Sequence, residues 1–137
     1  MRTCEPETAR TQSMELLLAE LQIQAATVAR AMQRFDAARS KTGDVQEGIR
    51  HTMADMAKVE EAQNTAATEA DKSRLASDMD RLKGGLFSMR KLEQDRLSNQ
   101  QEAEDSLRKT QDAYDAIEDQ LSALMKALRA AQGAGNK

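Results

Sequence analysis

The stretch that decides the fold is residues 107–128, which read LRKTQDAYDAIEDQLSALMKAL. Its large apolar residues recur at steps of three, four and seven, as the a and d positions of a heptad repeat do. They are Leu107, Tyr114, Ile117, Leu121, Leu124 and Leu128. A stripe this narrow predicts a coiled coil, in which the helix packs against at least one other helix.

The same phase extends back to Leu75 and forward to Ala131, through Met79, Leu82 and Met89. A second stripe begins at Met14 and, with d at Met14 and a at Leu18, alternates steps of four and three. Its members are Met14, Leu18, Leu21, Ala25, Val28, Met32, Phe35, Arg39, Thr42, Gln46, Ile49, Met53, Met56, Glu60 and Gln63. Two seams of this length predict two long helices.

The two seams differ in phase, and the offset falls in residues 64–74, where side chains able to cap a helix gather. We therefore predict an all-α fold, a long antiparallel helical hairpin with one elongated coiled-coil domain at 11–131. The first helix covers about 11–64, the turn about 65–73 and the second helix about 74–131. The flanking residues 1–10 and 132–137 are predicted to be flexible tails. Residue numbers that face each other sum to 142, which pairs Met53 with Met89.

Two other architectures stay open at this point. Gly43, followed by Asp44 and Glu47, could end one helix and start another, and Gly84-Gly85 could end a second, giving a three-helix spectrin-like bundle. A continuous helical rod with a skip near residue 70 is the third possibility. The unbroken heptad phase across both glycine sites favours the hairpin, in which the glycines become flexible points.

Composition narrows the classes of function. Charged residues make up 31% of the chain, aromatic residues 2%, and the formal net charge is −3, which is typical of long helices and gives no field that would attract nucleic acid. Met14–Leu21 is interrupted by two glutamates and is too short to span a membrane. The acidic N-terminus lacks the pattern of a signal peptide, and Cys4 is the single cysteine. We expect a cytoplasmic protein, free or associated with a large complex or the cytoskeleton.

No catalytic, cofactor or metal constellation is visible. His51 is the only histidine, and it falls on the side of its helix away from the seam. Gly84-Gly85 has no phosphate-loop pattern around it, and the acidic clusters lack the spacing of a calcium loop. We expect no enzyme, no cofactor, no metal and no small-molecule substrate.

A second apolar stripe lies outside the first seam. Leu16 and Ile23 fall on the far side of the helix, so apolar residues nearly surround it, which indicates burial by more than one neighbour. We predict a partner-binding patch at the open end of the hairpin. Its residues are Leu16, Leu17, Leu18, Leu21, Ile23, Ile117, Leu121, Leu124, Met125 and Leu128.

Polar residues inside the seams form a second candidate group. Arg39, Gln46, Glu93 and Arg96 occupy predicted a or d positions near the middle of both helices. Polar residues at such positions weaken a coiled coil but fix its register and its choice of partner. We predict that these four set register and specificity.

These features favour a non-enzymatic scaffolding subunit that binds other helical proteins, in a hetero-oligomer or by self-association. The first alternative is a helical-hairpin chaperone or adaptor that grips a client, which the eight methionines and the glycine points motivate. The weaker alternative is a membrane-surface or tethering factor.

Overall fold

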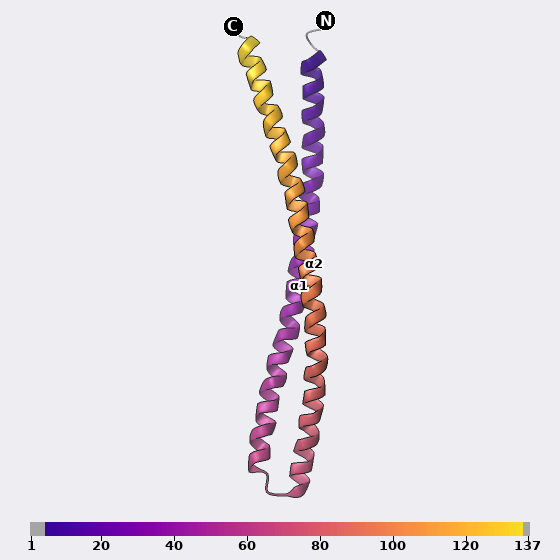
Figure 1. Cartoon of the computed structure of the whole chain (residues 1–137), viewed down its shortest axis with the longest axis vertical. Helices are drawn as coiled ribbons and strands as arrows, with labels where there is room; N and C mark the ends of the chain where they lie inside the picture. Colours follow the sequence, from indigo (N-terminus) through magenta and orange to yellow (C-terminus); the bar gives the residue numbers. More distant parts are fainter. Residues whose placement is uncertain (1–4, 136–137) are drawn as a thin grey trace. The chain divides into compact units, whose positions relative to one another are not determined.

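The computed structural model describes residues 5–135. Helix α1 covers Glu5–Thr65 and helix α2 covers Glu69–Gly135, and the two helices pack antiparallel as an all-α helical hairpin (Figure 1). The predicted hairpin is confirmed. Gly43, Gly84 and Gly85 lie inside the helices, so neither the three-helix bundle nor the continuous rod is formed.

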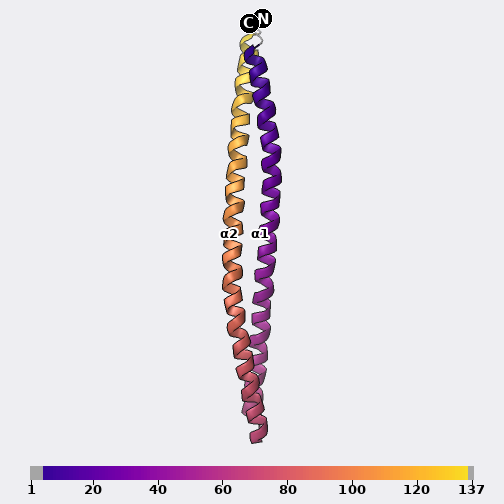
Figure 2. The same cartoon turned by 90° about the vertical axis from the view of Figure 1, so that its right-hand side faces the viewer.

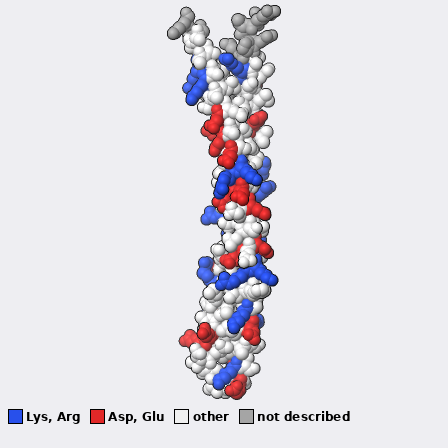
Figure 3. Space-filling model, viewed as in Figure 1, with Lys and Arg blue, Asp and Glu red and all other residues white. Residues whose placement is uncertain are grey.

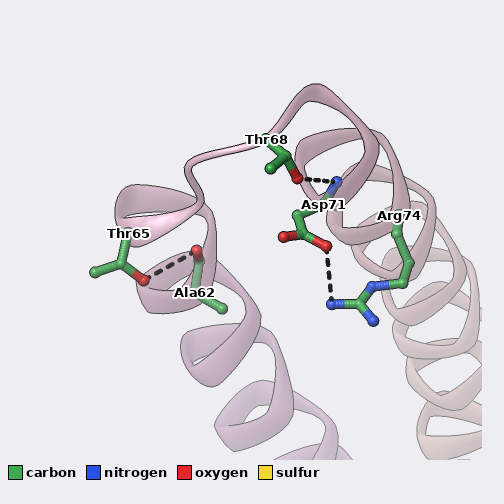
Figure 4. Close-up of polar contacts among 5 residues, drawn as sticks. All are labelled: Ala62, Thr65, Thr68, Asp71 and Arg74. Carbon is green, nitrogen blue, oxygen red and sulfur yellow. Dashed lines mark hydrogen bonds and ion pairs between the residues drawn. The ribbon is translucent and has the colours of Figure 1, made fainter.

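The turn is shorter than the nine residues predicted, because only residues 66–68 are non-helical. Thr68 caps α2: its side-chain oxygen accepts a hydrogen bond from the backbone N–H of Asp71 at 3.2 Å (Figure 4). Glu69 and Asp71 place negative charge in the first turn of α2, where the helix dipole favours it. At the end of α1, the Thr65 hydroxyl donates to the carbonyl of Ala62 at 3.2 Å. Residues 69–73, which were predicted to belong to the turn, therefore form the start of the second helix.

The helices also extend further than predicted at their outer ends. Residues 5–10 continue α1 and residues 132–135 continue α2, where flexible tails were expected. Pro6 lies in the first turn of α1, where its missing N–H costs no intrahelical hydrogen bond. The rest of the two predicted tails, residues 1–4 and 136–137, lies outside the described residues.

Contacts between residues divide the chain into two compact units. The terminal unit combines residues up to 34 with residues from 104 onward, and the turn unit contains residues 35–103. Both units contain one segment of each helix. Figures 1 and 2 follow the two helices in views at right angles.

The predicted seam of α2 is confirmed from Leu75 to Leu128. Every a and d position in this range is buried or half-buried, while the positions between them are mostly exposed. Leu75 is among the few buried apolar residues of the described chain. Ala131, the last predicted position, is exposed.

In the predicted seam of α1, the d positions are confirmed and most of the a positions are wrong. Its d positions, such as Met14, Leu21 and Ile49, face α2, but its a positions are displaced by one residue. The residues that face α2 are Leu17, Gln24, Ala31, Ala38, Val45, Thr52 and Val59, whereas Leu18, Ala25, Met32, Arg39, Met53 and Glu60 are exposed. With this displaced phase, small or uncharged residues occupy the interface, and the charged residues Arg39 and Glu60 avoid the cost of burial.

Contacts in the turn unit lie within one residue of the predicted pairing. The Thr52 hydroxyl lies 3.8 Å from Sδ of Met89, and the guanidinium of Arg90 lies 4.0 Å from Sδ of Met53. Thr52 is only 8% exposed, and its hydroxyl donates to the carbonyl of Gly48 at 3.0 Å. Bonding to the preceding turn lets a polar residue occupy the interface without an unpaired hydroxyl.

We expect Gly84→Ala with Gly85→Ala to raise the free energy of unfolding by about 1–2 kcal/mol, because alanine loses less backbone entropy than glycine in a helix. A Cβ at either position meets no atom within 4 Å. Gly48→Ala is the matched control, since its Cβ would lie 3.3 Å from Sδ of Met89 and offset part of the gain. Urea unfolding followed by circular dichroism measures the difference, and a loss of stability in the double variant would contradict the prediction.

Candidate interaction surfaces

The ten residues of the predicted open-end patch divide into two groups. Six of them are half-buried in the interface between α1 and α2 of the terminal unit: Leu17, Leu21, Ile117, Leu121, Leu124 and Leu128. Four are exposed: Leu16, Leu18, Ile23 and Met125. The first six hold the hairpin together, so only the exposed four offer apolar surface to another molecule.

Leu16 and Ile23 are seven residues apart and lie on one side of α1, where they form an outer ridge with Ala19 and Ala26, whereas Leu18 and Met32 lie on a different side of the helix. The exposed fractions are 67% for Leu16, 44% for Leu18, 65% for Ile23 and 48% for Met32. Between them lie the exposed alanines Ala19, Ala25, Ala26 and Ala29. Glu20 is the only charged residue from position 16 to position 29. This part of α1 is therefore apolar on its outer side as well as on the side that contacts α2.

The four predicted register residues do not share one environment. Gln46, Glu93 and Arg96 are half-buried, whereas Arg39 is exposed and lies outside the interface, with its guanidinium carbon 5.7 Å from the centroid of the Phe35 ring. The Nε atom of Arg96 is buried and has no hydrogen-bond partner within the described structure. Arg39 therefore lies over an aromatic ring of its own helix, and its predicted position in the seam was wrong.

A methionine groove lies between the helices of the turn unit and has a volume of about 540 Å³. Its apolar part comes from Met53, Met56, Met79 and Leu86, and its charged residues are Glu60, Asp80 and Lys83. The complete lining is Met53, Met56, Ala57, Glu60, Gln63, Ala76, Met79, Asp80, Lys83 and Leu86. The sequence pattern does not reveal this groove, because it places Met53 in the seam. In the structure Met53 lies beside the seam and is 50% exposed.

A basic segment of α2 borders this groove. Residues 81–92 contain Arg81, Lys83, Arg90 and Lys91 and no acidic residue. Phe87 is 62% exposed, and Nζ of Lys91 lies 4.6 Å from the centroid of its ring. Figure 3 shows blue and red side chains interspersed along the face in view.

The described residues contain no group of three or more histidine, cysteine, aspartate or glutamate side chains that could hold a metal ion. His51 is exposed, and its Nε2 lies 3.9 Å from a carboxylate oxygen of Glu47. Together with Arg50 these residues line a small hollow of about 200 Å³ on the surface of α1. None of the described helices has a stretch long and apolar enough to cross a membrane.

Comparison of the chain with protein-family models, with curated proteins and with solved structures finds no match. A function therefore has to be inferred from the surfaces of the hairpin. Two of them have no partner within the described hairpin: the outer ridge in the terminal unit and the methionine groove in the turn unit.

Proposed function

We propose that this chain is a non-enzymatic, cytoplasmic coiled-coil subunit that joins a larger assembly by packing further helices onto the outer ridge. The observation that supports this proposal is the exposure of Leu16 and Ile23, which are 67% and 65% accessible on a helix whose opposite side already contacts α2. Burying each of these side chains stabilises an assembly by about 1–2 kcal/mol. A third helix would supply that burial, as in helical bundles.

The ridge has the form of a helix-packing surface. Leu16, Ala19, Ile23 and Ala26 follow one another at steps of three and four, so large and small residues alternate along one stripe of α1. Such alternation lets an incoming side chain lie over an alanine while a ridge residue fills the space beside it. Nucleic acid has little to bind here, because residues 11–29 contain no basic residue.

We expect Leu16→Glu with Ile23→Glu to weaken association at least tenfold, because two glutamates would lose their hydration in the contact. The matched control is Gln12→Glu with Gln33→Glu, which adds the same charge at exposed positions on either side of the ridge. Light scattering measures self-association, and affinity capture from the native cell compares the proteins bound by each variant. An unchanged mass together with an unchanged set of bound proteins would overturn the proposal.

A further inference from the structure

The two unpartnered surfaces carry opposite local charge. Residues 11–29, which contain the outer ridge, have two acidic residues, Glu15 and Glu20, and no basic residue. Residues 81–92, beside the methionine groove, have four basic residues and no acidic residue. The two segments therefore carry local charge of opposite sign, which favours a contact between them.

The shapes of the two surfaces also correspond. The ridge presents the branched side chains Leu16 and Ile23, both mostly exposed. The groove presents Met53, Met56 and Met79 around a volume of about 540 Å³, within the roughly 300–1,000 Å³ typical of binding pockets. Methionine side chains are unbranched and adapt to irregular shapes, as in grooves that accept the apolar side of an amphipathic helix.

The charges around the groove give such a contact a direction. Arg90, whose guanidinium lies 4.0 Å from Sδ of Met53, marks the end away from the turn. Glu60 and Asp80 line the end nearer the turn, with Lys83 also in the lining. The carboxylates of an incoming helix are therefore favoured beside Arg90 and Lys83 and disfavoured beside Glu60 and Asp80.

We propose that the outer ridge of one copy of this chain docks into the methionine groove of a second copy, with Glu15 and Glu20 beside the basic residues of α2. The inference rests on the proposed function, because it names the partner that the ridge packs against. Exposed Phe87 lies in the same basic segment, one residue after Leu86 of the groove lining, and offers an aromatic surface to the second copy.

A charge swap tests this pairing without altering the apolar surfaces. One variant carries Glu15→Lys with Glu20→Lys and the other carries Lys83→Glu with Arg90→Glu, all at exposed positions. We expect each variant alone to self-associate about tenfold more weakly than the original chain. We expect an equal mixture of the two to recover association, because a basic ridge then meets an acidic groove. Light scattering and sedimentation equilibrium measure both effects.

The control is Lys41→Glu with Lys58→Glu, at two exposed lysines of α1, which changes the net charge by the same amount as the groove variant. It should associate as the original chain does, and circular dichroism should show the same helix content for every variant. A mixture that stays as weak as its components, or an original chain that is monomeric throughout, would overturn the pairing. If the charge variants associate normally while Leu16→Glu with Ile23→Glu does not, the ridge packs against another surface of the second copy, and only the groove contact is wrong.

Discussion

Ala31→Glu is expected to lower the free energy of unfolding by about 3 kcal/mol, whereas Met32→Glu, one residue further along α1, changes it by less than about 1 kcal/mol. Ala31 is 6% exposed and Met32 is 48% exposed. A glutamate at position 31 would be forced between the helices of the terminal unit without a partner, and it would also be too large for the space of an alanine. At position 32 the same side chain remains in water.

The two variants share the introduced residue, the helix and almost the same sequence position, so helix propensity cannot separate them. Urea unfolding followed by circular dichroism gives the free energy of each, at a protein concentration low enough that association does not contribute. The heptad phase read from the sequence places Met32 in the seam and makes the opposite prediction. Equal stabilities, or a larger loss at position 32, would contradict the burial that the structure shows.

The seam of α2 could be predicted from the sequence, whereas the phase of the α1 seam could not. In α2 the seam is filled by large residues such as Leu107, Ile117 and Leu121, and no neighbouring phase offers an equally apolar stripe. In α1 the residues Leu16, Leu17 and Leu18 are consecutive, so two phases are equally apolar at the start. Tertiary packing against α2 decides between them, and it selects small residues such as Ala31 that allow the helices to approach closely.

Of the two candidate surfaces, the outer ridge could be predicted from the sequence and the methionine groove could not. Leu16 and Ile23 could be recognised as unpartnered because they fall outside both possible phases of the α1 seam. The methionine groove could not be recognised from the sequence. It forms because Met53 lies beside the seam instead of in it, and because folding brings Met53 near residues such as Leu86 that are remote in sequence. The location of the turn was predictable from residues that cap helices, but its length was not, since Asp71 stabilises the first turn of α2 from within the helix.

Ile49→Ala is expected to lower the free energy of unfolding by about 2–4 kcal/mol, because it removes a side chain that is 6% exposed and leaves a cavity in a thin interface. In a hairpin with so few buried side chains, the loss is a large part of the total stability.

Ile23→Ala is the matched control for this prediction. It makes the same chemical change at a side chain that is 65% exposed, so the dilute chain should lose less than about 1 kcal/mol. Urea unfolding at low and high protein concentration separates the two roles of isoleucine. Ile49→Ala should destabilise the chain at every concentration, because its contacts lie within one copy. Ile23→Ala should become costly only where copies associate, and an equal loss for both variants in dilute solution would show that Ile23 packs within the hairpin.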